Sequence, residues 1–491
     1  MAVHRNRTLL FQLDSQSKTP LYRQIYDQVR RAILSGTLVE GDRLPSIRRA
    51  SADAGVAHTT VEQAYLQLAL EGYVRNVPRS GYRVEHFDAS FLRTSPVDTA
   101  NDLHAALAPR QRDAFTQENT RAQSARYDFS YANLQPDSFP VRTWRKLTDD
   151  ALYASTAPWL ARYGFTDKPG TLSVVLARYL AQARGVSCIP EQVLPQAGTD
   201  GALATVFQLF DHEQHLIAME EPGYATVHEV AKRMGYRIAG LPVDQGVDAY
   251  FAALEERKPK IVFATPSHQF PTGRVMGLDM RIRLLKWAEK NYAYIIEDDS
   301  CNEYRYGTSP IPSLQSLDAQ RRVVYLNNVS KVLSPALRIA YLVLPPKLLN
   351  RYLRTFAYAH PPVSALQQEV LARFISEGYW EQLLRRTATG NRKRHDALLS
   401  SLESELGDRI ELAGINSGMH LFATVKNSMS QDGLLESAAR QGAAVYGTKR
   451  MWFSRPAPEN KLLIGFSAIA IEDIAPGVAA LRRAWFPSSD R

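Results

Sequence analysis

The chain has only two cysteines, Cys188 and Cys301, among its 491 residues. Two cysteines are too few for a disulfide framework and lack metal-ligand spacing, so no metal site is predicted. No apolar run approaches the roughly 20 residues of a membrane span. The opening MAVHRNRTLLF also contains no apolar stretch of signal-peptide length. We therefore expect a cytoplasmic protein without a membrane partner.

Length and composition indicate a folded protein of more than one domain. The 491 residues exceed what one hydrophobic core usually organises, and 45% of them are hydrophobic. The formal charge of +9 raises the expectation of a polyanionic partner. Residues 1–87 carry 12 Lys and Arg against 8 Asp and Glu, so the positive excess is concentrated there.

Three helices are predicted near the N-terminus. Apolar residues recur every four positions over 21–33, which is typical of an amphipathic helix that ends at Gly36. Ser46 is suited to cap a short second helix that ends before the tight turn at Gly55. A third helix is predicted to open at Thr59.

The third helix is predicted to bury one face and to present the other to a ligand. Its apolar face consists of Val61, Ala64, Tyr65 and Leu68. The polar residues near its N-terminus are Thr59, Thr60, Glu62 and Gln63, at the end that would enter a DNA major groove. The string YVRNVPRSGYRV then predicts two short strands around a turn at 79–81, a basic wing that could reach phosphates or the minor groove.

The string LPSIRRASADAGVAHTTVEQAYLQLALEGYVRNVPRSGYRV resembles the GntR-type winged helix-turn-helix over its whole length. The match includes LPSxR, the TV…AY helix start, the LxxEGY end and the SG wing. The resemblance implies double-stranded operator DNA as a partner, contacted by Arg48, His58, Thr59, Thr60, Arg79 and Gly81. His58 replaces an arginine common in relatives, which would give up a phosphate attraction of roughly 1 kcal/mol.

A linker is predicted at 88–125, between a DNA-binding domain at 10–87 and a larger domain at 126–491. The segment is polar and has no sustained apolar stripe. In the larger domain, short apolar runs alternate with helix-length segments; the runs begin at residues 216, 261, 292, 323 and 341. This alternation predicts an α/β domain with a mostly parallel sheet and with ligand groups at the carboxyl ends of its strands.

Two of the predicted strands end in groups that suit pyridoxal phosphate (PLP). The run YIIEDDS ends in acids, and VVYLNNVSKVLSPALR ends a strand in Asn, Ser and Lys. PLP chemistry needs a lysine for the Schiff base and a carboxylate that keeps the pyridine nitrogen protonated. It also needs an arginine and helix N–H groups for the phosphate. We expect the acid and the amine to face one site.

Strings spread over the larger domain resemble fold-type I aminotransferases. They are PDSFPVRTWRK at 136, RYGFTDKPG at 162, RGVSC at 184, EEPGY at 220, TPSHQFPTGRVM at 265, IIEDD at 295 and SKVLSPALRIAYLV at 330. With the N-terminal match, the chain is similar to the MocR/GabR class, which fuses a GntR-type domain to this fold. The resemblance spans nearly the whole chain and implies a smaller C-terminal α/β part.

The resemblance places the Schiff base on Lys331, the pyridine-nitrogen carboxylate on Asp298 and the phosphate guanidinium on Arg338. Tyr224 is expected to stack on the cofactor ring. The remaining implied cofactor residues are Ser330 beside the lysine, Thr199 and Asp200 in a phosphate-cradling turn after Gly198, and His268, with Gln269 near the site.

Several positions depart from the family pattern. Residues 327–329 read NNV where relatives usually read GTF. Ser300 replaces a tyrosine that bonds the cofactor's 3′ oxygen, so that bond would fall to water, His268 or another group. Thr226 and Leu463 replace arginines that grip a carboxylate, each grip being worth roughly 1.5–3 kcal/mol. Arg455 is a candidate substitute grip.

The resemblance implies a PLP-dependent, DNA-binding transcription regulator that senses a small amine or amino-acid-like effector through an external aldimine. Two alternatives stay open: an active aminotransferase with an appended DNA-binding domain, and a sensor of PLP itself. The missing arginines argue against efficient transamination, since positioning supplies much of a rate. Fold-type I sites are built across a dimer, so a homodimer is expected, with Tyr163 as a candidate donor to the neighbouring site.

Overall fold

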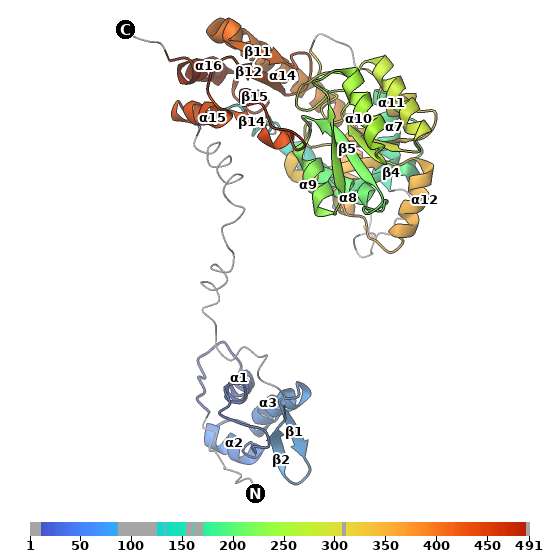
Figure 1. Cartoon of the computed structure of the whole chain (residues 1–491). Coiled ribbons are helices and arrows are strands. Elements are labelled where there is room, and N and C mark those ends of the chain that lie inside the picture. The colour runs from blue at the N-terminus through green and yellow to red at the C-terminus, as the bar shows by residue number, and fades with distance from the viewer. Residues whose placement is uncertain are drawn as a thin grey trace. The chain divides into compact units, whose positions relative to one another are not determined.

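The computed structural model describes residues 11–86, 125–131, 133–153, 160, 170–306 and 311–487. The chain divides into two compact units, Met1–Asp113 and Ala114–Arg491 (Figure 1). Tyr163 and the predicted linker, apart from its last residue, lie outside the described residues. Within the described ranges, no helix has both the length and the apolar character needed to span a bilayer.

Three helices and a two-stranded ribbon form the N-terminal unit. They are α1 (Leu21–Leu34), α2 (Ile47–Ala54), α3 (His58–Leu70), β1 (Val74–Val77) and β2 (Gly81–Val84). The Ser46 side chain caps α2 by accepting a hydrogen bond from the Arg49 N–H at 3.2 Å, and Gly55 ends it with φ 65°. The predicted helices and wing are confirmed, and α3 begins at His58, just before the predicted Thr59.

The apolar face predicted for α3 is the buried one. Its four residues, Val61, Ala64, Tyr65 and Leu68, are fully buried. They share one apolar cluster with Ile25 and Val29 of α1. Tyr65 also meets Tyr82 of β2 edge to face, with 5.2 Å between the ring centroids. This core joins α3 to the wing.

Seven strands form the central sheet of the second unit, in the order β4-β10-β9-β8-β7-β5-β6. They are β4 (Val193–Ala197), β5 (Leu216–Glu221), β6 (Arg237–Pro242), β7 (Ile261–Ala264), β8 (Tyr294–Asp298), β9 (Val323–Asn328) and β10 (Ile339–Val343). β10 is antiparallel to both of its neighbours, and the other pairs are parallel. The mostly parallel sheet is therefore confirmed, with all five of the predicted strands.

Helices pack on both faces of this sheet, coloured green to orange in Figure 1. Near one face lie α8 (Gly198–Phe207), α9 (Ala225–Arg233) and α12 (Pro346–Thr355), and near the other lie α10 (Val247–Arg257) and α11 (Leu278–Lys290). Ile217 and Met219 of β5 belong to the first cluster, while Ala218 between them belongs to the second. β5 is thus covered on both faces, which explains its unbroken apolar run.

A smaller antiparallel sheet follows, in the order β11-β12-β15-β14. Its strands are β11 (Ile410–Ala413), β12 (His420–Val425), β14 (Tyr446–Gly447) and β15 (Lys461–Gly465). A separate parallel pair joins β3 (Tyr127–Asp128) to β13 (Ala443–Ala444). The remaining helices are α6 (Val141–Tyr153), α7 (Thr171–Arg184), α13 (Ala365–Ser376), α14 (Tyr379–Leu406), α15 (Gln431–Arg440) and α16 (Ile471–Trp485). Short 3-10 turns lie at Pro190–Gln192, Gln315–Leu317, Pro335–Leu337, Gly407–Arg409 and Lys449–Met451.

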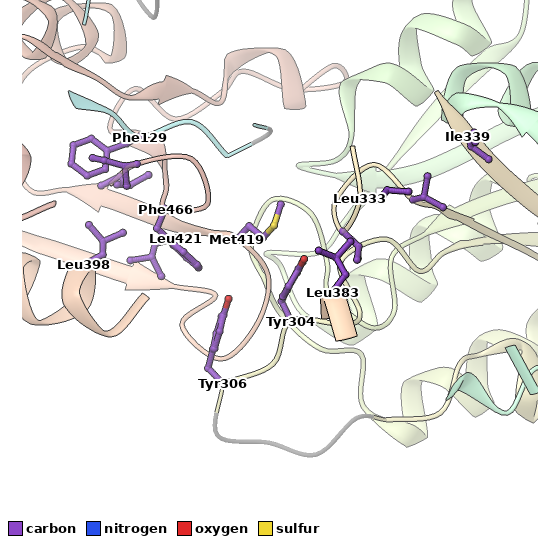
Figure 2. Close-up of a cluster of buried hydrophobic side chains, with 14 of the residues drawn as sticks. Phe129, Tyr304, Tyr306, Leu333, Ile339, Leu383, Leu398, Met419, Leu421 and Phe466 are labelled. Atoms are coloured by element: carbon purple, nitrogen blue, oxygen red, sulfur yellow. The ribbon is translucent and has the colours of Figure 1, made fainter. Parts of the chain in front are cut away.

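One buried cluster connects this C-terminal part to the central sheet. Figure 2 shows Leu398 of α14 and Leu421 of β12 at one end of the cluster, and Leu333 and Ile339 at the other, with Met419 between them. The continuous apolar packing fixes the C-terminal part against the strand ends that carry the predicted cofactor residues. The smaller C-terminal α/β part is confirmed.

Candidate functional site

Four strands bring four of the predicted cofactor residues to the same end of the central sheet. Asp298 ends β8, Lys331 follows β9, and Thr199 follows β4. β10 runs in the opposite direction, so its start lies at the same end; there Arg338 precedes Ile339, which pairs with Ala197 at the end of β4. The carboxyl ends of three strands and the amino end of the fourth therefore meet.

These strand ends open onto a cavity of about 630 Å³, part of which is open to solvent. Five predicted residues line it: Thr199, Tyr224, His268, Asp298 and Lys331. The other lining residues are Tyr131, Thr265, Phe270, Ser300, Cys301, Asn328, Met419 and His420.

The Asp298 carboxylate is buried, with 6% of the residue exposed. Its Oδ1 accepts hydrogen bonds from the Ser300 N–H at 3.0 Å and from the Ser300 hydroxyl at 2.5 Å. Burial raises the pKa of Asp298, while the Ser300 bonds and the charge of Lys331 lower it. Ser300 thus orients the carboxylate and favours its ionised form.

Asn328 connects Ser300 to the other side of the cavity. Its Nδ2 donates to Ser300 Oγ at 2.7 Å and lies 3.4 Å from Thr199 Oγ1. Its Oδ1 accepts from the Ser330 backbone N–H at 2.9 Å. In the sequence, Ser300 and Asn328 stand out only as losses from a family pattern, whereas in the structure they form a donor chain that ends on Asp298. Ser330 does not itself line the cavity.

The predicted phosphate end lies between Arg338 and the start of α8. Arg338 has φ 52°, and its guanidinium packs so closely on Gly198 that a Cβ there would lie 2.5 Å from Nη2. An Asp200 carboxylate oxygen lies 3.7 Å from the same guanidinium, and both side chains are about half exposed. Among the described residues, no side chain caps the start of α8. Its first backbone N–H groups can therefore bind an anion beside Arg338.

Aromatic side chains form one wall of the cavity. The Phe270 ring centroid lies 5.7 Å from that of Tyr224, 5.8 Å from that of Tyr131 and 5.3 Å from that of His420. Tyr224, expected to stack on a cofactor ring, is also the N-terminal residue before α9. Sequence reasoning missed Phe270, although it lies inside the quoted string TPSHQFPTGRVM. No sequence pattern around Tyr131 indicates that it lines a binding site.

Two buried histidines line the same cavity. His268 Nδ1 lies 2.8 Å from the Ser417 hydroxyl, and among the described residues its Nε2 has no hydrogen-bond partner. Burial lowers the pKa of His268 to about 3 and that of His420 to about 4, so both rings are neutral near pH 7. His420 Nε2 lies 2.9 Å from the Pro271 carbonyl oxygen. Because that oxygen can only accept, Nε2 carries the proton and Nδ1 presents a lone pair.

The three acids at the end of β8 point to different partners. Glu297 accepts hydrogen bonds from the backbone N–H groups of Leu314 and Gln315 at 2.5 and 2.8 Å. Asp299 is fully buried beside Arg184, with 2.7 Å between Oδ2 and Nε. Side chains alternate along a strand, so 297 and 299 share one side and Asp298 alone of the three faces the cavity. Sequence reasoning missed the Asp299–Arg184 pair.

Arg455, considered as a substitute carboxylate grip, does not line the cavity. Its guanidinium pairs with Asp244 and lies 3.7 Å from Glu221, and it also stacks over the Trp452 ring at 4.7 Å. Two carboxylates therefore already balance its charge. Leu463 is fully buried in an apolar cluster with Trp452. The structure does not favour Arg455 as the substitute grip. Gln269 lies behind the cavity wall and donates to the Pro222 carbonyl at 2.9 Å.

The predicted DNA-contacting residues lie on α2, α3 and the wing. They are Arg48 in α2, His58, Thr59 and Thr60 in the first turn of α3, and Arg79 and Gly81 in the wing. His58, Thr59 and Arg79 are exposed, as a surface that meets DNA requires. Arg83, which the prediction did not include, braces the wing by donating to the Gly41 carbonyl at 2.8 Å.

Comparison with known sequences identifies a family for the N-terminal part and relatives of nearly the whole chain. Residues 21–84 match the family described as "Bacterial regulatory proteins, gntR family". Over 467 residues the chain is 35% identical to the uncharacterized HTH-type transcriptional regulator YdeL of Bacillus subtilis, covering 95% of this chain and 97% of that one. Over 478 residues it is 32% identical to the probable rhizopine catabolism regulatory protein MocR of Rhizobium meliloti, covering 96% and 95%.

Solved aminotransferases share the fold of the second unit. LysN, the α-aminoadipate aminotransferase of Thermus thermophilus, is 25% identical with a TM-score of 0.67, covering 78% of this chain and 98% of that one. That protein was solved with N-(5′-phosphopyridoxyl)-L-leucine. The multiple substrate aminotransferase of Thermococcus profundus is 22% identical with a TM-score of 0.69, covering 78% and 98%. The predicted fold class is confirmed.

Proposed function

The chain belongs to the MocR-type transcriptional regulators, which join a GntR winged helix-turn-helix to an aminotransferase-like domain, and we propose that a small amine or amino-acid-like effector controls its DNA binding through a bound PLP. As a GntR-family regulator it binds DNA. The observation that carries the proposal is a single cavity lined by Lys331, Asp298, Thr199 and Tyr224, with Arg338 at the adjoining start of α8.

The residues in and beside this cavity suit the aldehyde, the pyridine nitrogen and the phosphate of PLP. Lys331 offers an amine for the cofactor's aldehyde, and Asp298 offers a buried carboxylate for the pyridine nitrogen. Arg338, Thr199 and the first N–H groups of α8 offer a cation and donors for the phosphate. When bound, PLP supplies an aldehyde that primary amines attack and a ring that withdraws electrons.

The protonation of the site depends on Asp298. A protonated pyridine nitrogen needs an ionised carboxylate beside it, and burial alone would favour the neutral acid. The Ser300 hydroxyl and N–H groups oppose burial by donating to Oδ1. His268 Nε2, which has no partner among the described residues, is a further polar atom that a cofactor or effector oxygen would satisfy.

Replacing Lys331 by Ala tests the cofactor assignment. After incubation with PLP and removal of the excess, the wild-type chain should retain a visible absorbance that Lys331→Ala lacks. Lys347→Ala is the matched control, because Lys347 is an exposed lysine of α12 outside the cavity. Borohydride reduction and peptide mass spectrometry should locate the cofactor mass on Lys331. Retained absorbance in Lys331→Ala would overturn the assignment.

Two other functions compete with effector-controlled regulation. Similarity to LysN over 78% of the chain favours an active aminotransferase. A relative that is 28% identical over 467 residues, the pyridoxine biosynthesis regulator PdxR of Corynebacterium glutamicum, favours a sensor of PLP itself. Measuring operator affinity with PLP alone and with PLP plus amine, and assaying for keto acid, distinguishes the three functions. A response only to amine together with PLP supports our proposal, a response to PLP alone supports the sensor, and continuous formation of a keto acid supports the enzyme.

We also propose that the chain acts as a homodimer. Two winged helices would then read two half-sites, in direct or inverted order. Sedimentation of the PLP-loaded chain, alone and with operator duplexes that carry one or two half-sites, tests this. A single chain per two-site duplex would contradict the dimer.

A further inference from the structure

We propose that the cavity selects primary amines that carry an aromatic or apolar body and no carboxylate. The inference rests on the proposed function, because it concerns the effector of the same cavity. It goes beyond that function by stating which of the two effector classes, simple amines or amino acids, the side chains suit. Three features of the described residues support it: an aromatic wall, an imidazole lone pair, and guanidinium groups that are already paired.

The aromatic wall offers burial for an apolar body. Phe270 lies at its centre, with the rings of Tyr131, Tyr224 and His420 within 6 Å of its own centroid. Met419 belongs to the buried apolar cluster and also lines the cavity, where its thioether adds a polarisable apolar surface. A ligand with an aromatic ring could make edge-to-face contacts here, whereas an anionic group against these rings would lose its water without gaining a cation.

The polar groups beside this wall suit donors rather than anions. His420 Nε2 donates to the Pro271 carbonyl, which leaves the Nδ1 lone pair as its second polar contact. His420 lines the same cavity, whereas Asp298 is taken up by the pyridine nitrogen in the proposed loaded chain. A ligand carboxylate beside the His420 lone pair would be repelled, while a hydroxyl group could donate to it. Burial lowers the pKa of both cavity histidines, so neither ring supplies a cation near pH 7.

Among the described residues, no arginine lines the cavity, and three arginines of the same unit have other partners. Arg184 lies 2.7 Å from the buried Asp299, and Arg455 pairs with Asp244 and lies 3.7 Å from Glu221. Arg338 packs against Gly198 at the phosphate end. The Lys331 amine is the group that the cofactor's aldehyde would use. A carboxylate in this cavity would therefore be buried without a matched cation from the described part of the chain, which is strongly unfavourable.

A matched pair of ligands tests the proposal, because 2-phenylethylamine and L-phenylalanine differ only by the carboxylate. Each is titrated into the PLP-loaded full chain, and the change in visible absorbance is followed. We expect 2-phenylethylamine to half-saturate the change at a concentration at least about tenfold lower than L-phenylalanine. L-Phenylalanine methyl ester, which keeps the body and removes the charge, should behave like the amine. Equal or stronger binding of L-phenylalanine, or a response only to an aliphatic amino acid, would overturn the proposal.

A variant that adds a cation provides a second test. Phe270→Arg should shift the preference toward L-phenylalanine, because the new guanidinium can pair with its carboxylate. The visible absorbance of the bound cofactor shows whether the variant still folds and loads. An unchanged preference in a loaded variant would count against the proposal. Absence of any Lys331-dependent absorbance in the wild type would instead reject the proposed function, so the two failures are distinguishable.

Discussion

At Asp298, burial and hydrogen bonding act on one carboxylate in opposite directions. Burial raises its pKa, and the Ser300 hydroxyl and N–H groups lower it by donating to Oδ1. The hydroxyl is itself fixed by the Asn328 amide at 2.7 Å. A hydrogen bond to a charged group contributes about 1.5–3 kcal/mol. A single hydroxyl can therefore decide over which pH range the carboxylate is ionised.

Ser300→Ala should weaken PLP binding and shift its pH dependence. Removing the hydroxyl raises the pKa of Asp298 further. Binding that needs the ionised carboxylate is present above that pKa and lost as pH falls through it, so in the variant the loss begins at a higher pH. PLP titrations between about pH 5 and 8 measure the shift, with an affinity loss of about tenfold near neutrality. Ser300→Thr keeps a hydroxyl and should resemble wild type. Identical pH profiles for the Ala variant and wild type would show that Ser300 does not control Asp298.

Individual residues of the candidate site could be predicted where they lie in contiguous strings, and not where long-range packing brings them to the cavity. Lys331 and Asp298 each end a recognisable run, and the structure places both in one cavity. The partner of Asp299 is Arg184, which lies 115 positions away, and nothing in the string RGVSC indicates this pairing. His420 enters the cavity only because the C-terminal sheet packs against the strand ends. The sequence offers Arg455 as a candidate substitute grip, but in the structure its guanidinium pairs with Asp244 and lies near Glu221.

Among the elements, the central strands could be predicted and the edge strands could not. β5, β7, β8 and β9 are buried on both faces, and each accordingly begins with an apolar run, which in β5, β8 and β9 is followed by polar residues at the strand end. β4 and β6 lie at the two edges of the sheet. β4 contains Pro195, which only an edge strand tolerates, so its sequence resembles a loop. Nothing in the sequence indicates that β10 runs antiparallel to its neighbours, although this direction brings Arg338 to the candidate site.

Gly198→Ala should selectively disrupt the phosphate end. Gly198 opens α8 with φ 73°, which a side chain rarely adopts, and a Cβ would lie 2.5 Å from the Arg338 guanidinium. We expect PLP affinity to fall at least about tenfold, as Arg338 must move. Gly201→Ala in the same helix is the control, because its Cβ would meet only Ala197 at 3.7 Å. Similar losses in both variants would argue for a general effect on α8 rather than a phosphate cradle.

In the wing, Arg79→Ala should weaken DNA binding with little change in sequence preference. Arg79 is exposed at the turn between β1 and β2, where a guanidinium can reach phosphates. Losing one phosphate contact should reduce the slope of log affinity against log salt by about 1. Arg75→Ala, which removes an exposed arginine of β1 that pairs with Glu85, is the comparison. An unchanged slope in Arg79→Ala would place its side chain away from the DNA backbone.

At the scale of the whole molecule, the two units carry separate chemistry. The N-terminal unit has its own buried core, and the predicted cofactor residues all lie in the second unit. Each predicted site draws its residues from one unit. The proposed regulation would therefore be a free-energy coupling between two separate binding events. Such a coupling acts equally in both directions.

This reciprocity gives the most stringent test of the proposed regulation. If an amine changes operator affinity by some factor, the operator must change amine affinity by the same factor. Typical couplings are about 5- to 150-fold. We expect the two factors to agree when operator binding is measured by fluorescence anisotropy and amine binding by the visible absorbance of the PLP-loaded chain. Lys331→Ala should abolish both factors without changing DNA affinity in the absence of amine. A chain that responded to amine in its absorbance, but showed no change in operator affinity, would be an enzyme or a passive binder rather than a regulator switched at this cavity.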